Sequence, residues 1–119
     1  MQWVMAEVRR IGNTCVWSLH GWQAAWAREK SLRQWALVNA GSVVLALMLD
    51  LTAAERALIL GLGLVLLAAE VMNTAIEEVV DYISTEIDPR AKRAKDCGSA
   101  AVALTALAGG VAWAVILIG

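Results

Sequence analysis

Three carboxylates and one amide share a face of a single expected helix in a mostly apolar stretch of the chain. At about 100° per residue, they fall within a sector of about 80°: Glu70, Asn73, Glu77 and Asp81. An ionisable side chain inside a membrane segment costs roughly 2.5–3.5 kcal/mol on insertion scales, so it indicates function by default. The competing interpretation is a polar stripe that bonds neighbouring helices. We favour function for Glu70, which lies deepest, and keep both interpretations open for Asp81.

Four basic residues follow this stripe: Arg90, Lys92, Arg93 and Lys95. Carboxylates hold Mg²⁺ through oxygen, usually one or two per ion, and phosphates supply further ligands. Lys and Arg neutralise phosphates. Together, stripe and cluster predict a site for a metal–polyphosphate ligand, with Glu70 as the base that activates an acceptor hydroxyl. The alternative for the cluster is an anchor on anionic lipid. Neither GxxxxGK[ST] nor GxGxxG occurs, so a nucleotide site here is of an unusual kind.

The composition indicates a membrane protein. Of 119 residues, 60% are hydrophobic and 18% charged, whereas soluble domains are about 45–50% apolar. A soluble domain of this length buries only roughly 60–70% of the surface that its unfolded chain exposes. The apolar excess must therefore face lipid, a partner chain or both. The net charge is −1, and we expect no nucleic-acid partner.

We predict one all-α membrane domain over residues 1–119, with three transmembrane helices and an N-terminal amphipathic surface helix. A bilayer core needs about 20 apolar residues, which favours spans at 32–49, at 53–84 with a cytoplasmic extension, and at 96–118. Residues 2–30 repeat apolar side chains at helical spacing, and five of the six Trp lie in the first 35 residues, which is typical of a surface helix. A cytoplasmic loop is expected at 85–95.

The basic residues also set the expected orientation. They precede the first and third spans, so the positive-inside rule places the N-terminus and the 84–96 loop in the cytoplasm and the C-terminus outside. Three thin helices enclose a site poorly, so we expect an oligomer.

Two long motifs carry a family resemblance. The stretches Glu70–Asp81 and Arg93–Val102 closely resemble the small prokaryotic integral-membrane diacylglycerol kinases. Shorter matches lie at Ala24–Trp26, Arg33–Gln34 and Leu49–Asp50, so the resemblance covers essentially the whole chain.

The resemblance implies a homotrimer in the bacterial inner membrane whose sites are shared between subunits. It implies transfer of the γ-phosphoryl group of MgATP to diacylglycerol, giving phosphatidic acid. The catalytic positions matched are Glu70 as general base and Asn73 beside it, and Glu29 and Glu77 match the acids that hold the metal. The nucleotide positions are Arg10, Trp17, Glu29, Glu77, Glu86, Lys95 and Asp96. The lipid positions are Ala24, Ala25, Trp26, Arg33, Arg56, Glu70, Ser99 and Trp113.

Two alternative functions stay open. Undecaprenol kinase uses the same apparatus on a different lipid alcohol. A small proton-coupled multidrug transporter also uses one intramembrane Glu, but such chains usually have four spans and need no carboxylate stripe beside a basic cluster.

Overall fold

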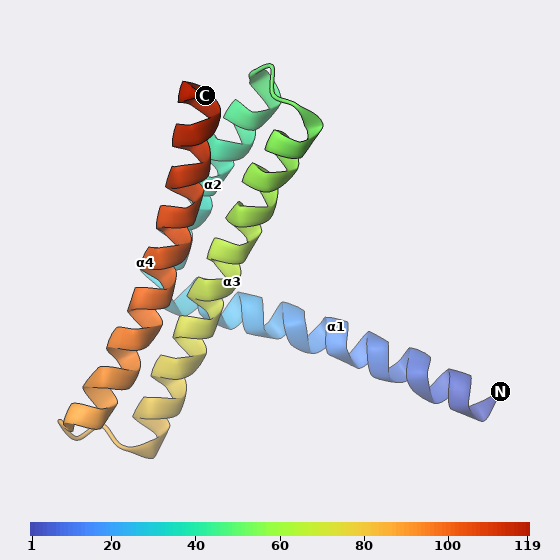
Figure 1. The fold of residues 1–119 in the computed structure, drawn as a ribbon. Helices are drawn as coiled ribbons and strands as arrows, with labels where there is room; N and C mark the ends of the chain where they lie inside the picture. Colours follow the sequence, from blue (N-terminus) through green and yellow to red (C-terminus); the bar gives the residue numbers. More distant parts are fainter.

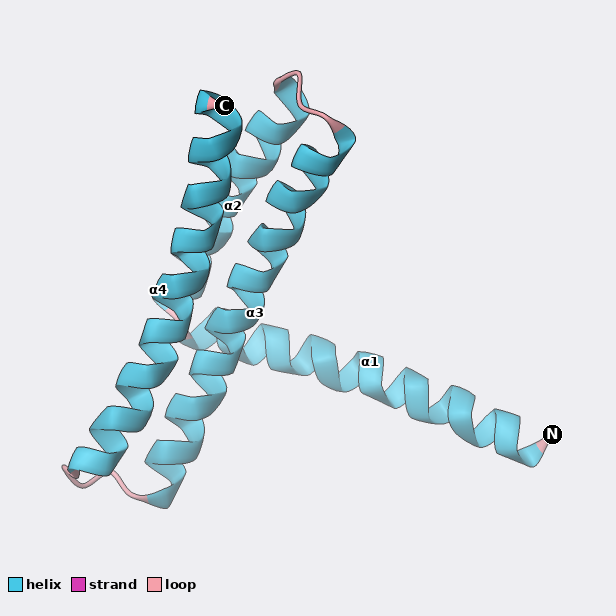
Figure 2. Ribbon diagram, viewed as in Figure 1, coloured by secondary structure: helices cyan, strands magenta, loops and turns pink.

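The computed structural model describes residues 1–119 as four helices joined by short connections (Figures 1 and 2). They are α1 (Gln2–Arg28), α2 (Lys30–Met48), α3 (Ala53–Ile83) and α4 (Pro89–Ile118). Helices α2, α3 and α4 form an elongated bundle, and α1 leaves it as an arm. The principal extents of 52 × 47 × 21 Å reflect this flat, angled shape.

A single extended residue separates α1 from α2. Glu29 has φ −104° and ψ 110°, so the surface helix ends at Arg28 rather than at the expected residue 30. The Glu29 N–H donates to the carbonyl oxygen of Ala25 at 2.8 Å. From α2, the Arg33 guanidinium donates to the carbonyl oxygens of Trp26 and Ala27, which satisfies carbonyls that the end of a helix leaves without partners.

Helix α3 begins with a capping box. The Thr52 hydroxyl accepts from the Glu55 N–H at 3.1 Å, and the Glu55 carboxylate accepts from the Thr52 N–H at 2.9 Å. This reciprocal pair fixes the start of the helix that carries the carboxylate stripe.

The expected loop at 85–95 is wrong in its extent, because α4 begins at Pro89. Asp88 caps the helix by accepting the Arg90 N–H at 2.7 Å, and a Pro in the first turn is compatible with a helix start. The basic cluster therefore lies on the first turns of a helix. The connection from α3 is correspondingly short.

Two helices are long and apolar enough to cross a membrane: the most apolar 18-residue segment has a mean hydropathy of 2.0 in α3 and 2.3 in α4. Only 28% and 11% of their most apolar windows are buried within one chain, so most of this apolar surface is left uncovered by the chain itself. Helix α2 does not meet the same criterion, because Arg33, Gln34 and Asn39 interrupt its apolar sequence. A span at 32–49 stays a prediction.

The chain packs around a small core. Ala46, Ile59 and Ala112 come together from the three bundle helices, and only ten residues of the chain are buried. Helix α1 exposes large apolar side chains that include Trp3, Val8 and Trp17. No other part of the chain packs on these apolar side chains, which agrees with the expectation that lipid or further copies of the chain contact them.

Candidate active site

Glu70 is almost completely buried, with 2% of its surface exposed, although it lies on an apolar helix. Its Oε2 accepts a hydrogen bond from the Ser31 hydroxyl at 3.1 Å. Thr74, one turn along α3, donates to the Glu70 backbone carbonyl at 3.1 Å. The deepest carboxylate of the predicted stripe is therefore held by a partner on the first turn of α2.

Glu77 lies one turn beyond Asn73 on the same face of α3, and two groups approach its carboxylate. The Asn73 Nδ2 donates to Glu77 Oε1 at 3.5 Å, and the Glu29 carboxyl group lies within hydrogen-bonding reach. Glu29 is also close enough to Glu70 for the two carboxyl groups to interact electrostatically. The extended junction between α1 and α2 thus brings one acid to the other two.

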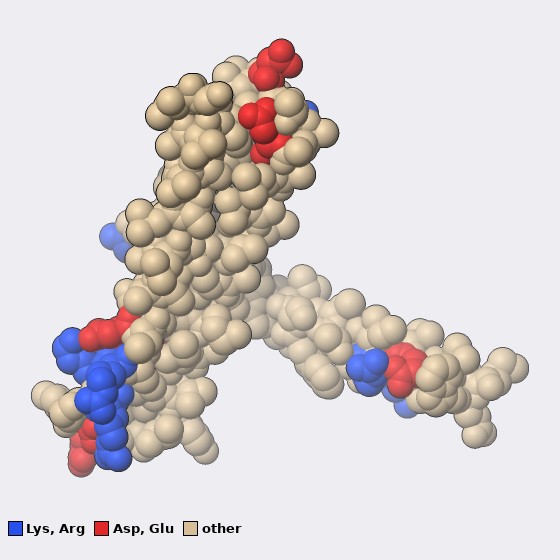
Figure 3. Space-filling model, viewed as in Figure 1, with Lys and Arg blue, Asp and Glu red and all other residues tan.

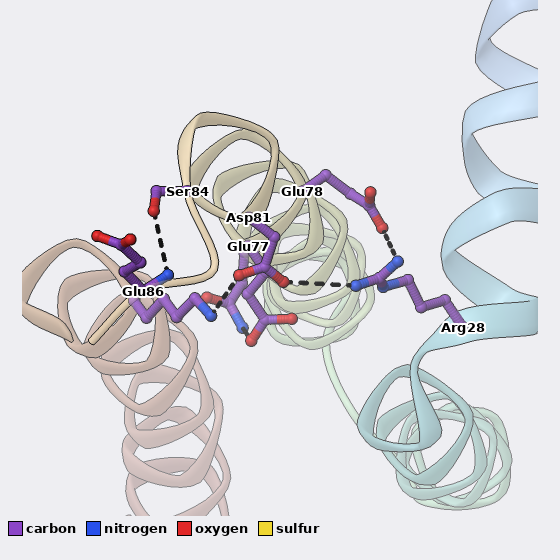
Figure 4. A network of polar contacts seen from close by, with 8 residues as sticks. Arg28, Glu77, Glu78, Asp81, Ser84 and Glu86 are labelled. Carbon is purple, nitrogen blue, oxygen red and sulfur yellow. Dashed lines mark hydrogen bonds and ion pairs between the residues drawn. The ribbon is translucent and has the colours of Figure 1, made fainter. Parts of the chain in front are cut away.

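Ion pairs tie three helices together just beyond these acids (Figure 4). Asp81 on α3 accepts from Lys95 Nζ on α4 at 2.7 Å and lies 3.7 Å from the Arg28 guanidinium of α1. Arg28 also pairs with Glu78 at 2.5 Å. The two ends of the stripe therefore differ, since Asp81 is compensated by two cations, whereas the structure gives Glu70 only the Ser31 hydroxyl.

A cavity of about 330 Å³ opens between the end of α3 and the start of α4. Its lining includes three residues that the family resemblance assigns to nucleotide: Glu86, Lys95 and Asp96. This volume is at the lower end of the range for small-molecule sites, about 300–1,000 Å³. Figure 3 shows Lys and Arg side chains gathered with acidic ones at this end of the bundle, while the middle of the visible face carries few charges and acidic side chains lie at the opposite end.

Asp88, the N-cap residue of α4, also lines this cavity. The hydrogen bond from the Arg90 side chain, together with the one from the Arg90 backbone N–H, holds the pKa of the Asp88 carboxyl below its ordinary value. Lys92 pairs with Asp96 at 2.5 Å one turn further along α4. The basic cluster is therefore partly neutralised by acids of its own chain.

Four of the predicted nucleotide residues do not line this cavity within one chain: Glu29 and Glu77, which lie close to Glu70, and Arg10 and Trp17. Arg10 and Trp17 lie on the α1 arm, where Arg10 pairs with Glu7 at 2.7 Å and Trp17 is 65% exposed. A single copy therefore brings Glu29, Glu70, Asn73, Glu77 and Lys95 together and leaves Arg10 and Trp17 outside.

The predicted lipid residues divide into two groups. Near the site, Ala25 is buried at the base of α1 and Ala24 is exposed. Trp26 packs on Trp22 with ring centroids 5.8 Å apart. Arg33 holds the last carbonyls of α1, and Ser99 is exposed on α4 beside the buried Gly98.

Arg56 and Trp113 lie toward the opposite end of the bundle. Arg56 Nε donates to the carbonyl oxygen of Ala46 at 2.8 Å, and Trp113 Nε1 donates to the Ser42 hydroxyl at 2.8 Å. Fourteen residues of helix separate Arg56 from Glu70, which is about 21 Å along α3. Within one chain, both side chains join helices and neither reaches Glu70.

One polar residue at the site, Ser31, was not predicted, nor was the exposed Arg28–Glu78 ion pair that lies outside it. Ser31 could have been noticed as a small hydroxyl two residues after Glu29, at the start of an apolar segment. Nothing in the sequence indicates that Arg28 pairs with Glu78, because the pair depends on the direction in which α1 leaves the bundle.

The acid set fits a divalent cation shared with phosphates. No group of three or more metal-ligating side chains is present, but Mg²⁺ usually takes one or two carboxylates and completes its shell with phosphate oxygens and water. Glu29 at the α1–α2 junction and Glu77 on α3, which lie close to each other, supply that number. The arrangement suits a metal held jointly by protein and ligand, in contrast to a metal cage built from protein alone.

Comparison with known proteins identifies the family of the chain. The family model described as "Prokaryotic diacylglycerol kinase" matches residues 16–117. The protein named diacylglycerol kinase in Pseudomonas aeruginosa is 44% identical over 114 residues, 94% of this chain and 91% of its own length. Its namesake in Escherichia coli K12 is 36% identical over 91% of this chain and 88% of its own length. The protein of the same name in Haemophilus influenzae is 34% identical over 88% of this chain and 89% of its own length. The chain therefore belongs to the prokaryotic diacylglycerol kinase family.

Proposed function

We propose that this chain transfers the γ-phosphoryl group of MgATP to the primary hydroxyl group of diacylglycerol, giving phosphatidic acid and ADP. The single observation that carries the proposal is the approach of the Glu29–Glu77 pair to buried Glu70, at the end of the bundle where a cavity is lined by Lys92 and Lys95 together with acids. The names of the relatives supply the lipid class.

Glu70 is proposed to act as the general base. It accepts the proton of the lipid hydroxyl as that oxygen forms a bond to the γ-phosphorus, and the bond from phosphorus to the leaving ADP oxygen breaks. Phosphoryl transfer depends mainly on positioning and on neutralising charge, so a buried carboxylate next to the metal acids is suitably located. Asn73 keeps Glu77 oriented through its amide donor.

Glu29 and Glu77 are the residues proposed to hold Mg²⁺, which, when bound, neutralises charge on the transferred phosphate. Lys95 is proposed to contact the phosphates as well, because its ammonium group already lies at the cavity. Glu86 and Asp96 line the same cavity and complete the nucleotide site on this chain.

Arg10 and Trp17 are proposed to serve the site of a neighbouring copy. In one chain the α1 arm points away from the bundle, and its apolar face is exposed. A homotrimer with shared sites gives Arg10 and Trp17 a role and covers part of the exposed surface. We propose the same orientation as the positive-inside rule, with the N-terminus and the α3–α4 connection in the bacterial cytoplasm and the C-terminus outside.

Undecaprenol kinase is the second candidate, because the same acids and cavity serve either lipid alcohol. Family membership argues against the transporter alternative. The test is a parallel assay of purified protein in mixed micelles with MgATP, using diacylglycerol and undecaprenol as acceptors. We expect a higher kcat/KM for diacylglycerol. A preference for undecaprenol would reassign the substrate, and no turnover of either lipid would overturn the proposal.

A further inference from the structure

The hydroxyl group of Ser31 is the only hydrogen-bond donor that the structure gives to the buried Glu70 carboxylate. Ser31 Oγ lies 3.1 Å from Glu70 Oε2, and no other side chain of the chain donates to either oxygen of this carboxylate. A carboxylate buried to this degree in a membrane helix needs compensation, because a desolvated charged group is costly. The Ser31 hydroxyl is therefore the one polar contact that orients the Glu70 carboxylate.

The position of Ser31 follows from the break between α1 and α2. Glu29 is extended, α2 begins at Lys30, and Ser31 lies on the first turn of α2, facing α3. The short segment 29–31 thus contacts the carboxylate stripe twice, through Glu29 at Glu77 and through Ser31 at Glu70. The same three residues connect the acid pair proposed for the metal to the proposed base.

We propose that Ser31 is a positioning residue for catalysis, which holds Glu70 Oε2 so that Oε1 is left to accept the proton of the lipid hydroxyl. This inference rests on the proposed function of Glu70 as base. General-base catalysis requires the base within about 2.6–3.2 Å of the proton donor in the reacting complex. A carboxylate free to rotate loses that alignment for much of the time, even when both substrates are bound.

Because Ser31 acts through Glu70 and touches neither substrate in this account, its loss affects turnover more than binding. We expect Ser31→Ala to lower kcat about 10-fold, the scale of a hydrogen bond to a charged group. The KM values for ATP and for diacylglycerol should stay within about 2-fold. Ser31→Thr keeps the hydroxyl and should recover most of the lost kcat, whereas a packing role would leave both variants equally impaired.

Ser18→Ala is the matched control. Ser18 lies on the exposed arm, and its hydroxyl donates to the carbonyl oxygen of Thr14 at 2.8 Å. A readout independent of activity is the infrared stretching band of the Glu70 carboxyl group, identified by its disappearance in Glu70→Gln. This band should shift in Ser31→Ala and stay in place in Ser18→Ala.

The experiment measures full-length wild type, Ser31→Ala, Ser31→Thr and Ser18→Ala in mixed micelles with MgATP and diacylglycerol. A kcat loss confined to Ser31→Ala, together with a shifted Glu70 band, supports the proposal. Ser31→Ala with wild-type kcat, or with an unshifted band, overturns it while leaving the proposed function intact. Wild-type protein without kinase activity would instead overturn the proposed function.

Discussion

The side-chain oxygen of Asn73 on α3 packs directly against the backbone of Gly98 on α4. A Cβ added at residue 98 would lie well inside 3.0 Å from Asn73 Oδ1 and 3.3 Å from Ile76 Cδ1. The same Asn73 oxygen is buried and lacks a hydrogen-bond partner. Gly98 therefore permits the approach of the two helices at the level where Asn73 meets Glu77.

Replacing Gly98 with alanine should separate α3 and α4 or displace Asn73. Alanine favours a helix over glycine by about 0.8–1.0 kcal/mol, so any loss of stability must come from the clash. We expect the free energy of unfolding to fall by about 1–3 kcal/mol, the usual cost of overpacking, and kcat to fall with it. Thermal unfolding in detergent and the kinase assay measure both. Gly110→Ala is the control, because no atom lies within 4 Å of its added Cβ.

Removal of a metal acid should change the magnesium dependence. Glu77→Gln and Glu29→Gln each keep the side-chain size and lose a ligand charge, so we expect half-maximal activity to need at least about 10-fold more Mg²⁺. A magnesium titration at saturating ATP measures this. Glu78→Gln is the control, since Glu78 neighbours Glu77 in sequence but is exposed and paired with Arg28. An equal shift for Glu78→Gln would mean that general charge, rather than a ligand pair, sets the response.

Sites shared between copies predict complementation. Arg10→Ala changes only the α1 arm and Glu70→Gln changes only the bundle, so each variant alone should have strongly reduced activity. Mixed oligomers from co-expression of the two variants contain some sites with both native residues and should regain activity. Separately purified variants, mixed only after detergent has stabilised each oligomer, are the control. Mixed oligomers that stay as inactive as each parent would place both residues in the site of one chain.

The start of α4 should respond to acid at a pH below the ordinary Asp value. The Arg90 side chain lowers the pKa of Asp88, so the charged cap adds stability above the ordinary pKa of 3.8. That stability is lost as the pH falls through the lowered value of the folded protein. The amide proton shift of Arg90, followed by NMR, should report this titration. Asp88→Asn keeps a capping acceptor and should abolish it, whereas titration at or above the ordinary value would contradict the account.

Helix type and approximate position were predictable, because apolar length and the 3.6-residue period survive in any packing. The shared face of Glu70, Asn73 and Glu77 needed only the helical repeat. The start of α4 was missed because the basic run of 90–95 resembled a loop, whereas the cap at Asp88 and Pro89 begins the helix earlier.

Contacts between helices were harder to predict. The Ser31–Glu70 hydrogen bond and the Arg28–Glu78 ion pair depend on the direction of the chain after Glu29, which periodicity does not encode. Arg56 and Trp113 show the opposite limitation. The family resemblance assigned them to the lipid, but the register of α3 and α4 places them toward the other end of the bundle from Glu70.

The most direct test of the account is transfer of labelled phosphate from γ-labelled ATP to diacylglycerol by wild type and by Glu70→Gln. Glutamine keeps the shape and the Ser31 contact but accepts no proton, so kcat should fall by roughly 10²–10⁴-fold. Glu78→Gln, prepared in parallel, should stay near wild type. Labelled phosphatidic acid formed by Glu70→Gln at the wild-type rate would contradict the assignment of Glu70 as the base.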